Sequence, residues 1–188
     1  MYDLQKIFDD CCAVYERCMN NIREMSYDVA NYMEKEGVDW DPNITCAKFD
    51  IALQYSLLQI ASSDLKLDEN ELIFIRDIAE EGDFLAYINS IGNTNITWES
   101  LFSSNIFTIR KLLRGLEGAM GELSEEFVRV FAVCDKATEY DFVADLERDL
   151  LAIVAGLINI DGTVSRSEMN EKCLILGTID RIKKIKNE

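Results

Sequence analysis

Two short acidic segments repeat one pattern, and this internal repeat constrains the fold more than any other feature of the sequence. Residues 64–71 and 161–168 both read Asp, two spacers, an aliphatic residue, a capping residue, two spacers and Glu. The offset is 97 residues at both ends, from Asp64 to Asp161 and from Glu71 to Glu168. Each segment follows one apolar run and precedes another. Because a repeat of this kind reports one structural unit used twice, the sequence predicts two similar helix-turn-helix units.

The rest of the chain favours helices throughout. It contains a single proline, Pro42, and long stretches between its glycines, which is unusual for a protein built from many short strands. Its 188 residues are 48% hydrophobic, enough for the core of one compact domain. The predicted fold is therefore all-α, a single bundle of about eight helices.

Four parts make up this predicted domain of residues 1–188. A long N-terminal helix occupies residues 1–40, the first repeat 42–91, the connecting helices 97–140 and the second repeat 141–188. Apolar residues in the first part recur at alternating steps of four and three, which is the spacing of a coiled-coil face. They are Leu4, Phe8, Cys11, Tyr15, Cys18, Ile22, Met25, Val29 and Tyr32. This face packs either against the rest of the domain or, in the alternative that stays open, against a second copy in a homodimer.

Local signals predict where several helices begin and end. Gly37 fits the residue that follows a helix C-terminus, and Asp41-Pro42 fits the start of the next helix. Asp68 with Glu71, and Ser165 with Glu168, have the spacing of capping boxes. We expect the helix that begins after Ser165 to run without a break to about residue 184.

Three glycines recur at every third residue in the connecting region. Gly115, Gly118 and Gly121 fall near one face of a helix predicted over residues 106–123, with a separate helix beginning at Ser124. Missing side chains on one face allow a second helix to approach closely. We therefore expect this face to be a helix-packing surface. A phosphate-binding loop is the weaker alternative, because no strand precedes the glycines and no Lys-Ser/Thr follows them.

The charge of the chain limits its partners. The formal net charge is −16 and the sequence pI is near 4.4, which disfavours nucleic acid and anionic membranes. It favours cations and protein partners with a basic surface. A basic cluster at residues 181–186 complements the C-terminal end of the last helix.

Other sequence features indicate the compartment. The longest apolar run, residues 150–160, is too short to span a membrane, and the first residues have no secretion-signal pattern. The six cysteines follow no CxxC spacing and are expected to be reduced. We expect a cytoplasmic protein.

The two acidic turns also form a candidate metal site. Carboxylate oxygens suit Ca²⁺, Mg²⁺ or Mn²⁺, and pseudo-symmetric packing could bring the turns together. The predicted ligands are Asp64, Asp68, Glu71, Asp161 and Glu168. A standard EF-hand is disfavoured, because its leading ligand position would be Leu157. The competing interpretation is purely structural, with the same side chains capping helices and shaping turns.

Catalysis finds little support in the sequence. The chain contains no histidine, which excludes Ser-His and Cys-His nucleophile pairs, and it has no Gly-x-Ser-x-Gly motif or P-loop. Cys11 and Cys12 offer a minor alternative, the capture of an oxyanion or a soft metal, but buried structural thiols are the expected role. We predict a non-catalytic protein.

The acidic turns resemble those of the tellurite-resistance TerB-like family. The resemblance covers about residues 50–82 and 145–180, and the segment from Asp161 to Glu168 has the family's most recognisable form. The first copy departs from it, with Leu65 where glycine is usual and Asp68 where serine is common. The resemblance implies an acidic helical module that binds divalent cations in a metal or stress response. The alternative is a protein-interaction module that uses the acidic face or the N-terminal helix without a metal.

Overall fold

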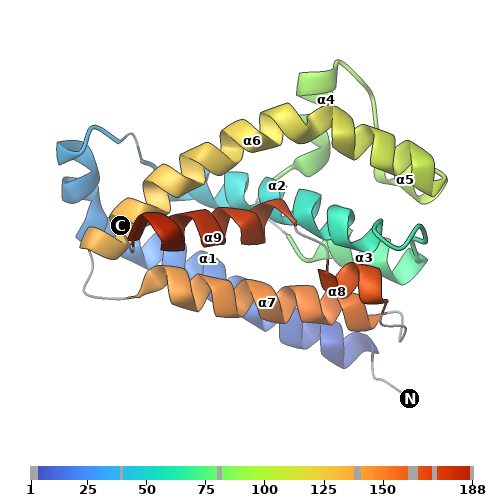
Figure 1. Cartoon of the computed structure of the whole chain (residues 1–188), viewed down its shortest axis with the longest axis horizontal. Coiled ribbons are helices and arrows are strands. Elements are labelled where there is room, and N and C mark those ends of the chain that lie inside the picture. The colour runs from blue at the N-terminus through green and yellow to red at the C-terminus, as the bar shows by residue number, and fades with distance from the viewer. Residues whose placement is uncertain are drawn as a thin grey trace.

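The computed structural model describes residues 4–38, 40–79, 82–137, 141–160, 165–170 and 173–186, without the side chains of residues 25–28, 136–137 and 169–170. Every regular element in these ranges is an α-helix, so the predicted all-α class is confirmed (Figure 1). The elements are α1 (Leu4–Lys35), α2 (Pro42–Ala61), α3 (Glu69–Asp77), α4 (Phe84–Gly92), α5 (Trp98–Phe102), α6 (Ile106–Ala137), α7 (Phe142–Ile160), α8 (Arg166–Asn170) and α9 (Leu174–Lys186). None of the described helices is long and apolar enough to cross a membrane.

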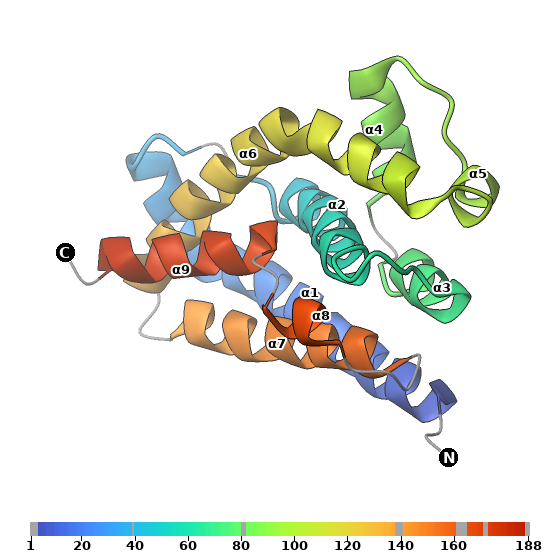
Figure 2. The same ribbon diagram turned by 45° about the vertical axis from the view of Figure 1, so that its right-hand side comes forward.

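The long N-terminal helix is present, and its apolar face is buried inside the domain. α1 and α7 lie side by side and run in opposite directions (Figures 1 and 2). Cys11, Tyr15, Cys18 and Ile22 on the predicted face are each at most 5% exposed. A Cβ atom at Gly156 of α7 would overlap Cys11 Sγ, so this glycine allows the two helices to approach closely. The heptad-like spacing therefore serves packing within the chain.

The two predicted helix-turn-helix units interlock. α3 packs against α7, the first helix of the other unit, and α8 packs against α2 (Figure 2). α2 lies at the centre, and it is buried around most of its circumference. A helix that is apolar on all sides is stable only inside a protein, and α2 carries buried aliphatic and aromatic residues from Phe49 to Ala61. The repeats thus share one interior.

The connecting region differs from the prediction. α6 is one continuous helix of 32 residues rather than two helices that meet at Ser124. A Cβ atom at Gly115, Gly118 or Gly121 would meet no other group within 4 Å, so the predicted close helix approach at these glycines is wrong. The opposite face of α6 holds the helix together, because it buries apolar side chains along its length. These are Ile109, Leu113, Leu116, Met120, Leu123, Phe127 and Phe131.

The last predicted helix is divided into α8 and α9. α9 begins at Leu174, whose N–H donates to Gln59 Oε1 at 2.9 Å, and the N–H of Ile175 donates to Ser56 Oγ at 3.1 Å. Two side chains of α2 therefore satisfy amides that a helix start leaves without partners. A cap supplied by a distant helix has no local sequence signal, which is why the sequence predicted one unbroken helix.

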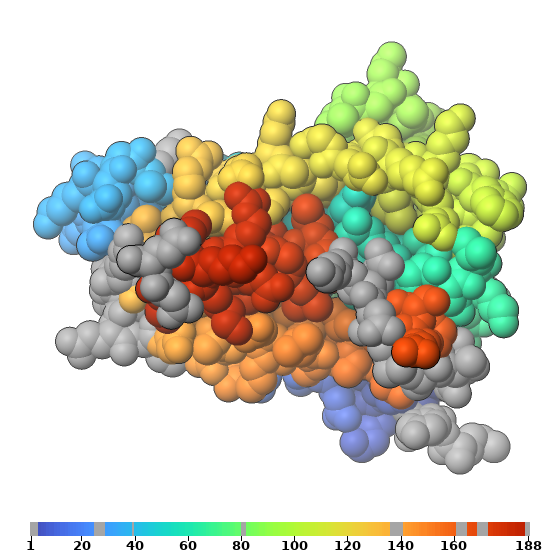
Figure 3. Space-filling view, in the orientation of Figure 1, coloured from blue at the N-terminus to red at the C-terminus, as the bar shows by residue number. Residues whose placement is uncertain are grey.

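Three of the four cations in the C-terminal basic cluster, Arg181, Lys183 and Lys186, form ion pairs with acids elsewhere in the chain. α9 lies between α6 and α7 on the face shown in Figure 3. Arg181 pairs with Glu125 of α6 at 2.7 Å, and Lys183 pairs with Glu147 of α7 at 2.8 Å. These ion pairs connect α9 to α6 and α7.

Candidate functional site

The first acidic turn uses its carboxylates to organise the backbone. Asp64 Oδ1 accepts a hydrogen bond from Lys66 N at 2.8 Å, and Asp68 Oδ1 accepts one from Asn70 N at 2.8 Å. Glu71 Oε2 accepts one from Asp68 N at 2.7 Å, which completes the predicted capping box. Leu65 adopts a φ of +67°, the left-handed region in which glycine is favoured. Glycine stands at the corresponding position of the second copy, Gly162.

The second turn contains a matching capping box. Ser165 N donates to Glu168 Oε2 at 3.0 Å, and Glu168 N donates to Ser165 Oγ at 3.0 Å. Glu71 and Glu168 are both buried, at 3% and 5% exposed. The two capping boxes that the sequence predicted are therefore confirmed.

The predicted metal site receives no assembled ligand set from these carboxylates. In the part of the chain that the structure describes, no three or more Asp, Glu, Cys or His side chains are grouped so that they could hold a metal ion. Asp161 lies outside the described residues. The five predicted ligands therefore remain a prediction, with four of them placed and all four already accepting backbone hydrogen bonds within their own turns.

The six cysteines are free thiols, and five of them are buried. Burial raises the pKa of Cys11 to about 11 and that of Cys18 to about 12. A thiol with such a pKa is protonated at neutral pH and is a poor nucleophile. The capture of an oxyanion or a soft metal by Cys11 and Cys12 stays a prediction.

A buried carboxylate that the sequence interpretation missed joins α1 to α7. Asp149 has no exposed side-chain surface, and it accepts hydrogen bonds from Arg17 Nη2 at 2.6 Å and Arg17 Nε at 2.8 Å. Arg148 Nε adds a third at 3.1 Å. Burial disfavours the charged form, but these hydrogen bonds outweigh that penalty and hold the pKa of Asp149 below its usual range. The only sign of this buried carboxylate in the sequence was an acidic residue on the same stretch of helix as the core residues Leu146 and Leu150.

A second buried carboxylate, Asp50 of α2, also joins elements that are far apart in the sequence. The Tyr15 hydroxyl lies 2.9 Å and 2.8 Å from its two oxygens, and Gly82 N donates to Asp50 Oδ2 at 2.8 Å. A Cβ atom at Gly82 would overlap the carbonyl oxygen of Ala47, so the chain before α4 passes very close to α2. Asp50 thus joins α1, α2 and the segment before α4, which is a structural role.

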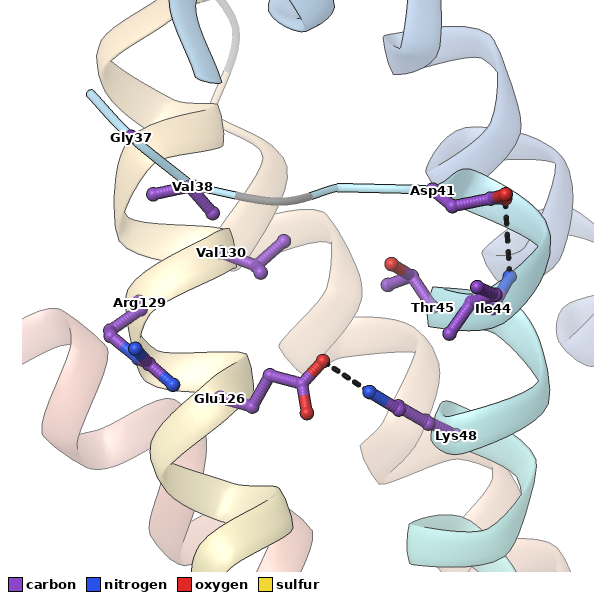
Figure 4. A pocket seen from close by; sticks show the side chains of 9 residues that line it. All are labelled: Gly37, Val38, Asp41, Ile44, Thr45, Lys48, Glu126, Arg129 and Val130. Atoms are coloured by element: carbon purple, nitrogen blue, oxygen red, sulfur yellow. Dashed lines mark hydrogen bonds and ion pairs between the residues drawn. The ribbon is translucent and has the colours of Figure 1, made fainter. Parts of the chain in front are cut away.

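A cavity of about 360 Å³ lies where α2 begins. Figure 4 shows Lys48 of α2 and Glu126 of α6 reaching toward each other across it, at 2.6 Å. Val38 and Val130 form an apolar side, and Arg129 extends from α6. None of the predicted ligands lines this cavity. Since an internal ion pair already crosses it, the cavity offers no convergent set of unpaired polar groups for a small ligand.

A smaller groove brings together the two surfaces that the sequence singled out. It lies between the start of α1, the outer face of α3 and the end of α7, and its volume is about 240 Å³. We call it the α1–α3 groove. Its lining is Leu4, Gln5, Phe8, Asn70, Ile73, Phe74, Asp77 and Ile160. The groove joins the N-terminal helix to the acidic segment of the first repeat.

Comparison with protein-family models, with curated proteins and with solved structures found no match to this chain.

Proposed function

We propose that this protein is a non-catalytic binding module that engages a protein partner through the α1–α3 groove. The partner contributes a basic amphipathic segment, with apolar side chains in the groove and lysine or arginine at its rim. The single observation that carries this proposal is an apolar groove set in an acidic surface, at the start of the N-terminal helix.

The floor and walls of the groove supply the apolar contact. Leu4 is 40% exposed, and Ile73 is partly exposed on α3 without belonging to the core or to the side chains packed against it. Beneath them, Phe8 and Phe74 meet edge to face with ring centroids 5.8 Å apart. A rigid aromatic floor with aliphatic walls suits an apolar anchor residue of a partner helix.

The charges around the groove select a basic partner. The two segments that form it, residues 4–10 and 64–77, contain more acids than bases. Asp9, Asp68 and Glu69 are exposed, and Asp77 lies on the groove wall, where Arg76 already pairs with it. Opposite charge on a partner speeds association and fixes its orientation. An acidic partner would be repelled here, as nucleic acid would be.

A peptide titration tests this proposal. The probe is a synthetic helical peptide with leucine on one face and lysine on the other, followed by NMR on the isotope-labelled full chain. We expect saturable shifts at residues 4–8 and 70–77. Ile73→Ser should weaken binding by roughly fivefold, because an aliphatic contact worth about 1 kcal/mol is lost.

Two controls separate groove binding from general attraction to an acidic protein. Leu151→Ser removes a comparable exposed aliphatic side chain, 49% exposed, on α7 outside the groove, and should leave the affinity unchanged. A scrambled peptide of the same composition should bind at least about fivefold more weakly. Equal binding of both peptides, or equal effects of both substitutions, would rule the groove out.

A second candidate function is the divalent-cation site that the TerB-like resemblance implies, in a tellurite or stress response. It is supported by the interlocking of the two units and by the burial of one carboxylate in each turn, Glu71 and Glu168. Calorimetry with Ca²⁺, Mg²⁺ and Mn²⁺ tests it. Asp64→Asn, Asp68→Asn and Asp161→Asn remove charge from the turns, and asparagine preserves an N-cap. Binding should fall in these variants but not in Asp83→Asn, which alters the cap of α4 instead.

A further inference from the structure

A basic cluster on α6 stands out because nothing in the described residues neutralises it. Residues 100–116 contain no acid, yet they include Arg110, Lys111 and Arg114. In a chain with 35 acids and 19 bases, three neighbouring cations without an ion pair are unexpected. Within the ranges the structure describes, these three side chains make no ion pair and no hydrogen bond, unlike Arg181 and Lys183 of α9.

Two of these cations line a small pocket. Arg110 and Arg114, one turn apart on α6, face the end of α2 across a pocket of about 110 Å³. Gln59, Ser63 and Tyr55 belong to the α2 side of its lining. Ser63 Oγ is buried, and no hydrogen-bond partner for it occurs among the described residues. A buried hydroxyl without a partner is costly in a folded protein, so this one is available to a ligand.

We propose that this pocket between α2 and α6 binds an oxyanion, a single phosphoryl or carboxylate group of a ligand whose remaining part stays outside. Two guanidinium groups supply planar donors that match oxyanion geometry, and the Ser63 hydroxyl supplies a third donor. The volume excludes a larger ligand, since pockets for drug-sized molecules measure about 300–1,000 Å³. The site shares no residue with the α1–α3 groove and does not depend on the function proposed for it.

Two features of the pocket oppose an anion and sharpen the test. Glu117 lines the pocket one turn beyond Arg114 and makes no ion pair in the described part of the chain. The C-terminal end of α2 also carries partial negative charge. Because Glu117 repels an anion, removing its charge should strengthen oxyanion binding. The Tyr55 hydroxyl adds no donor to the site, since it already donates to the carbonyl oxygen of Leu113 at 3.1 Å.

The experiment is a titration of the full chain with inorganic phosphate and, separately, with acetate, at constant ionic strength set by chloride. NMR of the arginine side chains and of the residue 62–63 amides reports binding. We expect saturation by at least one of the two anions, and the tighter one identifies the phosphoryl or the carboxylate source. Arg110→Gln and Arg114→Gln should each weaken binding roughly fivefold or more, and Glu117→Gln should tighten it about twofold or more.

Lys111→Gln is the matched control, because it removes the same charge from the same helix without touching the pocket. It should leave the affinity within about twofold. Ser63→Ala should weaken binding without lowering the melting temperature, since the hydroxyl contributes no hydrogen bond to the described fold. The proposal is overturned if neither anion saturates, or if Lys111→Gln weakens binding as much as Arg110→Gln.

Discussion

Two buried carboxylates, Asp149 and Asp50, connect helices of this protein, and each accepts hydrogen bonds from a second element. Asp149 of α7 is bound by Arg17 of α1, and Asp50 of α2 by Tyr15 of α1. A buried carboxylate is tolerated only when hydrogen bonds replace its hydration. Because these partners come from elements far apart in the sequence, neither pair could be predicted from local patterns.

The Asp149 pair should make stability depend on pH. Its pKa is depressed in the folded protein, so its contribution is complete above the unfolded value of about 4 and is lost as the pH falls through the folded value. Asp149→Asn should lower the free energy of unfolding by about 1–3 kcal/mol at pH 7, since Arg17 is half-exposed and less dependent on the pair than a buried cation. Urea unfolding at pH 7 and pH 3 measures this, and the difference between variants should shrink at pH 3. An equal difference at both values would contradict the assignment.

The strained residue Leu65 offers a second prediction. A leucine in the left-handed region costs about 1–2 kcal/mol, whereas glycine there costs only chain entropy of about 0.5–1 kcal/mol. Leu65 is 52% exposed, so little packing is lost on its removal. Leu65→Gly should therefore raise the free energy of unfolding by about 0.5–1 kcal/mol. Thermal unfolding checks it, with Leu67→Gly, in the same turn, expected to destabilise.

At the scale of the elements, local capping signals were reliable and long-range effects were not. Asp41, Asp68 and Ser165 all cap helix starts as the sequence predicted. The continuity of α6 and the start of α9 were missed. The continuity of α6 depends on a row of buried apolar side chains, which outweighs the three glycines with open space around them. The start of α9 depends on hydrogen-bond acceptors from α2. Tertiary contacts decide both, so sequence spacing alone misplaced the boundaries.

Two glycine positions should respond to alanine in opposite directions. Gly118 lies in a helix with open space around it, so Gly118→Ala should stabilise the protein by about 0.5–1 kcal/mol. Gly156 lies against Cys11 Sγ, so Gly156→Ala should force α1 and α7 apart and cost about 1–3 kcal/mol. Denaturant unfolding of the two variants tests the packing directly. Effects of the same sign would show that the α1–α7 contact is wrongly described.

At the scale of the whole molecule, the repeat predicted the architecture better than it predicted the site. Two helix-turn-helix units do share one interior, as their common pattern indicated. The acids of the repeat, however, were chosen as metal ligands from their spacing alone. In the described turns they accept hydrogen bonds from backbone amides at helix N-termini. The α1–α3 groove could not be foreseen, because it is formed by residues around positions 8, 74 and 160, which only the folded chain brings together.

The most direct test of this account is site-specific photo-crosslinking of the full chain in an extract of its source cells, followed by sequencing of the captured segments. The reactive group is placed at Ile73 inside the α1–α3 groove or at Leu151 outside it. The account predicts that Ile73 captures a basic amphipathic segment, that Leu151 does not, and that the synthetic Leu/Lys peptide competes for the product. Capture of acidic segments, or equal capture from both positions, would contradict it.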